Sequence, residues 1–197
     1  SASAQKLPVY LMGALAHGLG CYAFSYINNV KHGTNIVIEC LHRIFCHLLT
    51  IKSGRLPRVL FLQLDNTCKQ NKNKYMIGYL ACMDQWHVFS QVYMSFLPVG
   101  HTHEDVDQYF SKIAGHLRTN DAFDRNDIVN AASHFHPHWA PNDFFCHTEH
   151  VENAANISTW LESKLSNFSC RVKSFQQYRI RRPDQACLRE VTVQGRA

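Results

Sequence analysis

The stretch Val59-Leu-Phe-Leu-Gln-Leu-Asp65-Asn66 decides how this chain folds. Its apolar run ends abruptly in two polar residues and passes into segment 67–74, which is rich in lysine and asparagine. A run of this kind is typical of a buried strand that delivers the acid after it to one edge of a sheet. Asp65 is therefore the first candidate for a catalytic or metal-binding residue.

A second strand-to-helix junction follows about thirty residues later, by the same reading of apolar runs and breaks. Residues 88–96 predict a strand that breaks at 97–100. The residues from His101 to Phe110 then predict a helix with acids in its first turns and Thr102 as candidate N-cap. Both junctions carry acids, and a shared sheet could bring them together.

The segments upstream of this stretch predict two strands and a helix. Residues 10–16 and 20–27 predict a hairpin, because a short glycine-containing turn joins two apolar runs. Residues 34–50 have apolar side chains at helical spacing, with Thr34 as candidate cap, and the same spacing marks residues 72–83. The order of strands and helices predicts an α/β fold.

The last third of the chain is less regular. The same rules predict helices over 104–117, 127–135 (capped by Asp124 or Asn126) and 157–165, and a terminal hairpin of 174–180 with 188–193. We expect a core of residues 1–120 and a small C-terminal α+β extension, residues 121–197, that packs on it.

Composition and charge exclude some classes of protein. With 197 residues, 46% of them hydrophobic, the chain can bury one sizeable core and is not disordered in composition. The net charge of +5 permits a polyanionic partner, but the basic residues are spread out and favour nucleic acid only weakly. The eight cysteines include no Cys-x-x-Cys pair and predict reduced core thiols. No leader, long apolar span or lipidation motif is visible, so we expect a soluble intracellular protein without a membrane partner.

Two motifs resemble those of a known protein family: Asp65-Asn66-x-Cys68-x-Gln70-Asn71-Lys72-Asn73, and Phe96-Leu97-x-Val99-Gly100-His101-Thr102-x-x-x-x-Asp107-x-x-Phe110. Together they look like the catalytic core of a transposon-derived family of eukaryotic proteins, and this core is similar to the ribonuclease H-like fold of DDE-type transposases and integrases. The resemblance spans roughly residues 5–117. It implies a ribonuclease H-like mixed sheet flanked by helices, activity as a polynucleotidyl transferase or nuclease on DNA, and a nuclear location.

The resemblance also implies roles for individual acids. In such folds the first acid lies on the first strand, the second at the end of the fourth strand and the third on a later helix. Asp65 matches the second position and Asp107 the third, with Glu104 and Asp105 as neighbours that could share its role. Two Mg²⁺ or Mn²⁺ ions favour in-line attack at a phosphodiester and take hard oxygen ligands. Asp65 would bridge both ions, Asp107 would hold one, and His101 would orient a phosphate or assist proton transfer.

The first acid is missing from the pattern. The family has an Asp-x-Ala-Gln stretch shortly before a proline, and Ala2 stands here where that aspartate would be. Glu39, the only acid upstream of the central stretch, falls in the middle of a predicted helix. We therefore expect a poor catalyst, since two ions are not fixed without a full set of ligands.

The expected partner is duplex DNA, contacted through its backbone. Lys69, Lys72 and Lys74 follow the central acid closely and would line the approach of the phosphates. The pattern leaves the oligomeric state open between monomer and homo-oligomer.

Each of these assignments has an alternative. Asp65 could simply close an Asp-Asn turn that caps the following helix, and the acids after residue 103 could simply favour the helix dipole. The chain could be a domesticated, inactive descendant that binds DNA or protein. A zinc-supported interaction module is a third class, for which the candidate ligands lie within one short segment: His134, His136, His138, Cys146, His147 and His150.

Overall fold

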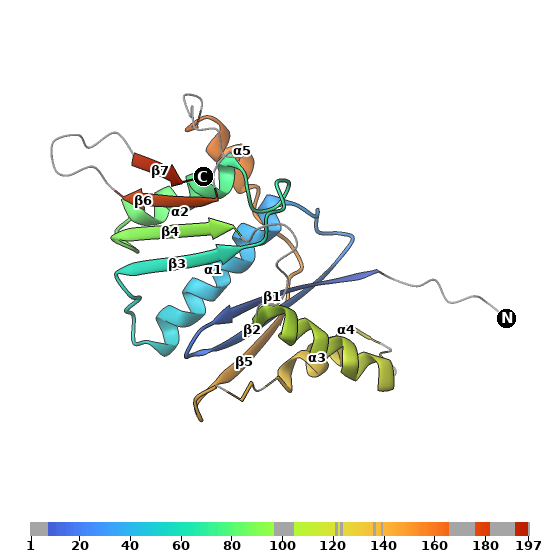
Figure 1. Cartoon of the computed structure of the whole chain (residues 1–197). Coiled ribbons are helices and arrows are strands. Elements are labelled where there is room, and N and C mark those ends of the chain that lie inside the picture. Colours follow the sequence, from blue (N-terminus) through green and yellow to red (C-terminus); the bar gives the residue numbers. More distant parts are fainter. Residues whose placement is uncertain are drawn as a thin grey trace. The chain divides into compact units, whose positions relative to one another are not determined.

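The structure is a computed structural model of the chain. It describes residues 8–96, 105–120, 122, 124–135, 137–138, 140–165 and 176–181, and the backbone of 192–196. The elements in chain order are β1 (Val9–Ala16), β2 (Gly20–Ile27), α1 (Thr34–Ile51), β3 (Val59–Leu64), α2 (Lys74–Gln85), β4 (Gln91–Phe96), α3 (Asp105–Thr119), α4 (Arg125–Ser133), β5 (Phe145–His150), α5 (Ile157–Glu162), β6 (Gln177–Arg181) and β7 (Thr192–Arg196). These elements form a mixed α/β fold with two sheets (Figure 1), which confirms the predicted class at that level.

The chain divides into two compact units, each built from two separate segments. The first unit comprises Ser1–Lys31 and His101–Ala154, and the second comprises His32–Gly100 and Ala155–Ala197. The sequence predicted a single boundary, between a core of residues 1–120 and an extension of residues 121–197. The structural grouping differs because the last third supplies one strand to the sheet of the first unit and two strands to the sheet of the second.

The first unit contains the three-stranded sheet β1-β2-β5. The hairpin of β1 and β2 is antiparallel, as predicted, and the amide of Leu19 closes its turn on the carbonyl of Ala16 at 2.9 Å. Helix α3 packs on β1, and α4 packs on β2 and β5. The core between these elements is apolar and centres on Cys21, Ala23, Tyr109, Ile113, Ala131, Ala132 and Phe135.

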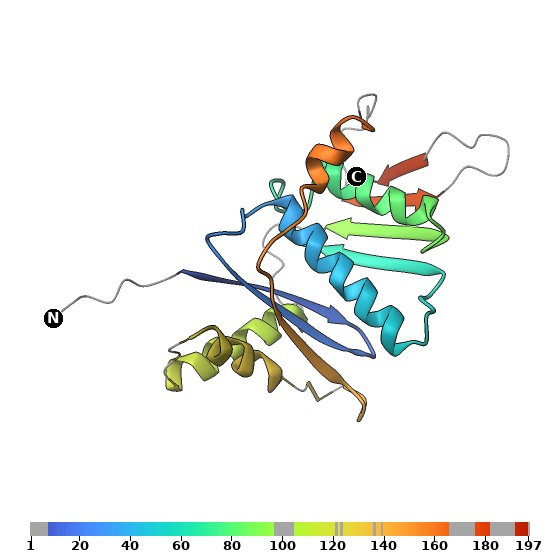
Figure 2. The ribbon, with the colours of Figure 1, turned by 180° about the vertical axis from the view of Figure 1, so that it is seen from behind.

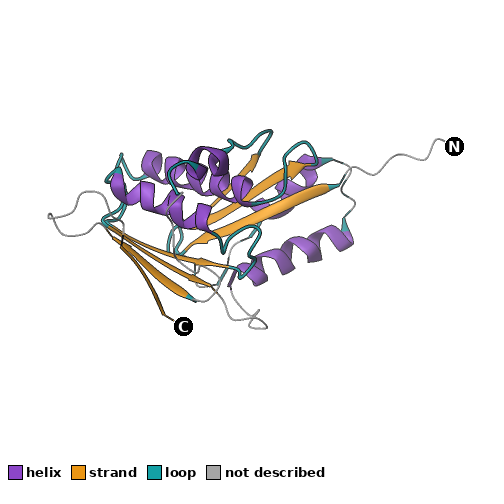
Figure 3. Ribbon diagram, turned by 90° about the horizontal axis from the view of Figure 1, so that it is seen from above, coloured by secondary structure: helices purple, strands orange, loops and turns teal. Residues whose placement is uncertain are grey.

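The second unit contains the four-stranded sheet β3-β4-β6-β7. Strand β3 runs parallel to β4, whereas β4 with β6 and β6 with β7 are antiparallel. The β6–β7 pairing confirms the predicted terminal hairpin, with shifted bounds. Helices α1 and α2 lie over one face of this sheet (Figures 2 and 3), and α5 packs on both helices.

Side chains of β4 and β6 alternate between buried and accessible positions. Val92, Met94 and Phe96 of β4 are buried, as are Tyr178 and Ile180 of β6. The residues between them are partly or fully accessible. This alternation is the pattern expected of a sheet with one face packed against helices and one face open.

Strand β3 has the sequence of a buried strand but lies at an edge of this sheet, so the prediction of a buried strand is wrong. Its residues range from half-buried to exposed, because β4 is its one neighbour among the described strands. The apolar run itself was read correctly as a strand with the bounds Val59–Leu64.

Helix α1 begins as predicted, but its start is not capped by Thr34. Gly33 occupies the N-cap without a side-chain hydrogen bond, and the Thr34 hydroxyl instead donates to the Lys69 carbonyl at 3.0 Å. By length and composition alone α1 could cross a membrane, with a mean hydropathy of 1.2 over 18 residues. Eight of its residues are buried and it packs on α2 and α5, as a core helix does, so it is weak evidence of a membrane span.

Candidate functional site

Asp65 follows β3 directly, at the carboxyl end of the strand, and its side chain is exposed. Its Oδ1 atom accepts hydrogen bonds from the Thr67 amide at 2.9 Å and from Asn71 Nδ2 at 2.5 Å. Among the described residues no hydrogen bond reaches its other oxygen, Oδ2. One oxygen therefore holds the side chain in place and the other is available to a ligand.

The bond to Thr67 shows that the Asp-Asn turn given as the alternative is present. The turn does not exclude a ligand, because it occupies one of the two carboxylate oxygens. The same alternative made this turn the cap of the following helix, which is wrong. Asn73 caps α2 instead, accepting from the amides of Tyr75 at 3.1 Å and Met76 at 3.2 Å.

The loop after Asp65 is tightly folded and fixed to the start of α1. Three successive amides, those of residues 70–72, donate to the Thr67 carbonyl at 2.8 to 3.2 Å. Asn73 Nδ2 donates to the Thr34 hydroxyl at 2.8 Å and to the Cys68 carbonyl at 3.2 Å. A carboxylate at the base of such a loop is held in one geometry before a ligand arrives, which is what a binding site needs.

Asn71 is the residue that sequence analysis undervalued. It is 7% exposed, and its Oδ1 atom is buried with no hydrogen-bond partner in the described part of the chain. Buried amide oxygens are usually satisfied, so this oxygen marks either a ligand position or a water position. The sequence pattern named Asn71 only as a member of the first motif, and the pairing of Asp65 with an asparagine six residues later is the feature that could have revealed its role.

The three lysines near Asp65 have different environments. Lys69 is exposed. Lys72 is only 3% exposed, and its ammonium lies 3.4 Å from Gln176 Oε1 and 5.3 Å from the centre of the Phe96 ring. The described conformation thus does not present all three lysines to a phosphate backbone together.

Lys74 is neutralised by an acid. Its Nζ atom lies 2.7 Å from Glu162 Oε1, and Tyr75 is hydrogen-bonded to the same carboxylate. The bond from Lys74 is the main reason that the pKa of Glu162 falls below its usual value, and the bond to Glu162 raises the pKa of Lys74. Both groups are solvent-exposed, so the pair contributes little to stability.

The strand ends expected to lie together do so. Strands β3 and β4 are parallel neighbours whose last residues, Leu64 and Phe96, are register partners. The chain therefore leaves the sheet at adjacent points before Asp65 and before residue 97. This arrangement confirms the sheet part of the expectation, and the meeting of the acids themselves stays a prediction.

The acids expected to complete the site belong to the first unit. Asp105 and Asp107 lie in the first turn of α3, where carboxylates favour the positive end of the helix dipole. Asp105 Oδ2 is 3.8 Å from His17 Nδ1. His101, Glu104 and Ala2 lie outside the described residues, as does Thr102.

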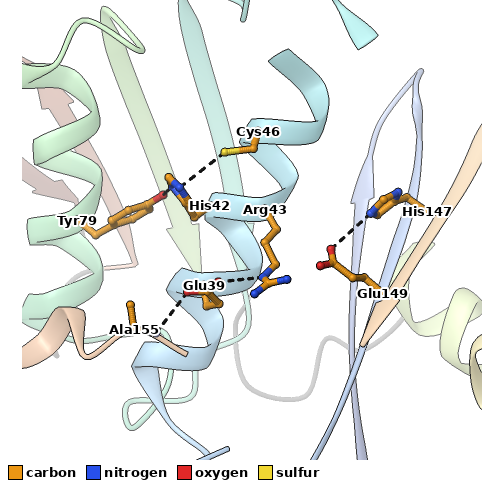
Figure 4. A network of polar contacts seen from close by, with 8 residues as sticks. All are labelled: Glu39, His42, Arg43, Cys46, Tyr79, His147, Glu149 and Ala155. Atoms are coloured by element: carbon orange, nitrogen blue, oxygen red, sulfur yellow. Dashed lines mark hydrogen bonds and ion pairs between the residues drawn. The ribbon is translucent and has the colours of Figure 1, made fainter. Parts of the chain in front are cut away.

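Glu39 lies within a helix, as predicted. It lies in the middle of α1, where its Oε1 atom accepts from Arg43 Nε at 2.9 Å and its Oε2 atom accepts from the Ala155 amide at 3.4 Å (Figure 4). On the same helix, His42 contacts the Tyr79 hydroxyl at 3.4 Å, and burial raises the pKa of that tyrosine. Both oxygens of Glu39 are therefore engaged within the second unit.

No three of the five described residues of the proposed zinc set lie together. Their described contacts are separate: His134 Nδ1 donates to the Asn130 carbonyl at 2.6 Å, Cys146 Sγ lies 2.7 Å from Cys21 Sγ, His147 Nε2 lies 3.6 Å from Glu149 Oε2 (Figure 4), and His150 is hydrogen-bonded to Ser25 and Asn126. Within the described residues of either unit, no three His, Cys, Asp or Glu side chains are placed to hold a metal ion. His136 lies outside those residues.

The six described cysteines are free thiols, as expected, but not all are core thiols. Cys21 and Cys40 are buried, whereas Cys46 and Cys68 are exposed. Cys21 and Cys146 face each other across the parallel strands β2 and β5, and this contact lies in the apolar core of the first unit.

Comparisons with known proteins give a family and nothing finer. No curated protein and no solved structure matches the chain. A family model described as "Domain of unknown function (DUF7869)" matches residues 1–193, so the chain belongs to this family.

Proposed function

We propose that this chain is a divergent domain of the DDE-type transposase class, which binds DNA and a divalent cation through Asp65 but has little catalytic activity. The observation that supports the proposal best is the position of Asp65. It follows a strand whose parallel neighbour ends at the same level, and Thr67 and Asn71 hold one of its oxygens. Ligands of open α/β sheets commonly bind outside the carboxyl ends of the strands.

The residues of the second unit fit one hard cation. Mg²⁺ is usually held by one or two carboxylates together with waters and substrate phosphates. Asp65 Oδ2 and the buried Asn71 Oδ1 are oxygen ligands of the right kind. A bound divalent ion would supply Lewis-acid stabilisation of a phosphate and a more acidic water.

Weak catalysis follows from the number of ligands. One carboxylate at these strand ends does not fix two ions against their mutual repulsion. Asp107 is assigned the third acid by resemblance alone, and Ala2 stands at the position of the first. The closest alternative is therefore an inactive descendant that binds DNA without cutting it.

The deciding experiment is Mn²⁺-dependent cleavage of duplex DNA. The chain as it stands should cut poorly, Ala2→Asp should gain metal-dependent cleavage, and adding Asp65→Asn to that variant should abolish the gain. Efficient Mg²⁺-dependent cleavage by the unchanged chain, lost in Asp65→Asn, would show that the first acid has been misplaced. No cleavage by Ala2→Asp at any metal concentration would favour the non-catalytic alternative.

Duplex binding is tested separately through its salt dependence. Binding should be weak and without sequence preference, because it would rest on backbone contacts, and it should fade steeply between low and high salt. Affinity that does not change with salt, or the absence of any binding, would contradict the proposed partner.

A further inference from the structure

Three side chains form a continuous row across the four-stranded sheet. Phe61 on β3 is the register partner of Tyr93 on β4, which is in turn the register partner of Arg179 on β6. The Phe61 and Tyr93 rings are stacked, with centroids 5.0 Å apart and planes at 12°, and the Arg179 guanidinium lies 5.4 Å from the centre of the Tyr93 ring. The row lies on the accessible side of the sheet, opposite the buried residues of β4 and β6.

One side chain holds two members of this row in place. Gln91 Oε1 accepts from the Tyr93 hydroxyl at 2.9 Å and from Arg179 Nη2 at 2.9 Å. The orientation of the tyrosine ring and of the guanidinium is therefore fixed before any partner binds. Preorganised aromatic and arginine groups lose little entropy on binding.

Phe61 leaves one face of its ring uncovered. Tyr93 covers one face, and because β3 is an edge strand the other face points past the edge of the sheet. The residue is 76% exposed, more than the other large apolar side chains that are exposed in the described chain. A stacked cross-strand pair stabilises a sheet modestly, but stabilisation alone does not require one ring to stay so exposed.

The surroundings of the row are polar and basic. The neighbouring positions on this side hold Val59 and otherwise amides and a hydroxyl, namely Gln63, Gln91, Ser95 and Gln177, and Arg181 lies on the same side of β6 as Arg179. No aspartate or glutamate occupies an accessible position of β3, β4 or β6. Among the described residues neither arginine has a carboxylate within ion-pair distance, and Arg179 Nε is buried without a hydrogen-bond partner.

We propose that this face binds single-stranded DNA, with an unpaired base stacked on the open face of Phe61 and the phosphate backbone directed toward Arg179 and Arg181. An open ring face, a fixed guanidinium and uncompensated positive charge are the features by which sheet surfaces hold single strands. Duplex DNA does not fit, because its bases are stacked on one another and show only their edges in the grooves. The amides around the row suit base edges, whereas an apolar protein partner would require a wider apolar surface.

The proposal does not use Asp65, and only the choice of DNA over RNA rests on the proposed function. It is tested by fluorescence anisotropy with a labelled 15-residue oligothymidylate, alongside the matching oligouridylate and a duplex of equal length. Phe61→Ala should weaken oligothymidylate binding about tenfold, as loss of one stacked base does. Phe61→Trp should retain binding. Phe61→Leu should behave like the alanine variant, because it keeps the apolar surface but loses the aromatic face.

Trp86→Ala is the matched control. Trp86 is also exposed, at 57%, and belongs to the same unit, but lies at the end of α2, outside the row. This variant should bind normally. Arg179→Gln should lower the slope of log affinity against log salt by about 0.7, the value for one phosphate contact to a single strand. Because Phe61 is largely exposed and loses only one stacked cross-strand contact, its variants should lower the melting temperature by no more than about 4 °C, which separates lost binding from lost folding.

The outcomes are distinguishable from those of the proposed function. Binding lost in Phe61→Ala but unchanged in Asp65→Asn supports this inference even if no cleavage is ever observed. Metal-dependent cleavage with normal oligothymidylate binding by Phe61→Ala would overturn it while the proposed function stands. Tighter binding of the oligouridylate would overturn the assignment to DNA. Equal binding by Phe61→Leu and wild type, or self-association lost in Phe61→Ala, would point to an apolar protein partner and contradict the proposal.

Discussion

Asn71 Nδ2 donates a hydrogen bond to Asp65 Oδ1 at 2.5 Å and thereby fixes the one carboxylate that follows β3. The asparagine is buried and the aspartate is exposed, so the interior of the loop orients the surface carboxylate that we propose as a metal ligand. Groups that orient a metal ligand in this way matter nearly as much as the ligand itself.

The first prediction concerns this orientation. Asn71→Ala should weaken Mn²⁺ binding about tenfold, because groups that orient metal ligands contribute factors of 10 to 100 in affinity. Asn71→Asp should weaken it as well, because the aspartate keeps the shape of the side chain but loses the amide that donates to Asp65 Oδ1. Titration of Mn²⁺ by electron paramagnetic resonance measures both. Wild-type affinity in both variants would show that the hydrogen bond from Asn71 does not orient Asp65 for the ion.

The second prediction concerns the cap of α2. Asn73→Ala removes two accepted bonds at the helix start and two bonds donated to neighbouring segments. Replacing an N-cap residue by alanine costs about 1–2 kcal/mol of unfolding free energy. Asn73→Asp keeps the cap acceptors but not the donated bonds, so it should fall between alanine and wild type in urea denaturation. An alanine variant as stable as wild type would show that the loop does not depend on this residue.

The third prediction tests the packing of β5 on β2. A Cβ atom at Gly20 would lie 2.5 Å from the Phe145 carbonyl oxygen, which is backbone and has little room to move. Gly20→Ala should therefore destabilise the protein by about 1–3 kcal/mol, the usual cost of overpacking.

Gly115→Ala is the control in the same unit. A Cβ there meets nothing within 4 Å, so the change should stabilise helix α3 by about 0.5–1 kcal/mol through helix propensity. Thermal melting of both variants checks the pair of predictions. The same sign of change in both would contradict the described packing of β5.

The β1–β2 hairpin, strand β3 and helix α4 could be predicted because local chemistry determines them. The turn between β1 and β2 contains glycine, and Asp124 forms a capping box with Asp127. Strand β5 was missed because its last four residues, His147 to His150, are all polar and show no apolar alternation. Its partner β2 also lies about 125 residues away, as the pair Cys21 and Cys146 shows. Nothing local marks such a pairing.

The candidate site was predicted only at Asp65. The motif named Asn71 and Lys72 but did not show that one is buried against the acid and the other against Phe96. The row of Phe61, Tyr93 and Arg179 was not predicted at all, because it depends on the register of three strands, one of which comes from the far end of the chain.

The fourth prediction concerns the pH dependence of Cys146. A hydrogen bond with Cys21 holds the pKa of the Cys146 thiol below its ordinary value, whereas the same bond and burial raise the pKa of Cys21. Cys146 should therefore form its thiolate at lower pH, and its alkylation by iodoacetamide should reach half-maximal rate below about pH 8.5, the usual cysteine pKa.

Removing the partner gives the control. Cys21→Ala should move that midpoint upward, since the hydrogen bond that favours the thiolate is gone. Cys40→Ala removes a buried cysteine from the other unit and should leave the midpoint unchanged. Peptide-resolved mass spectrometry reads the rate at Cys146 alone. A midpoint that Cys21→Ala fails to raise would contradict the assigned hydrogen bond.

Direct binding of Mn²⁺ to the unchanged chain and to Asp65→Asn, followed by electron paramagnetic resonance, tests the central claim most directly. The substitution keeps the shape of the side chain and its surface position but removes the charge that a hard cation requires. We predict weak binding by the unchanged chain and at least about tenfold weaker binding by Asp65→Asn, with little change in melting temperature. Equal binding by the two proteins would contradict the claim that Asp65 is a metal-binding acid.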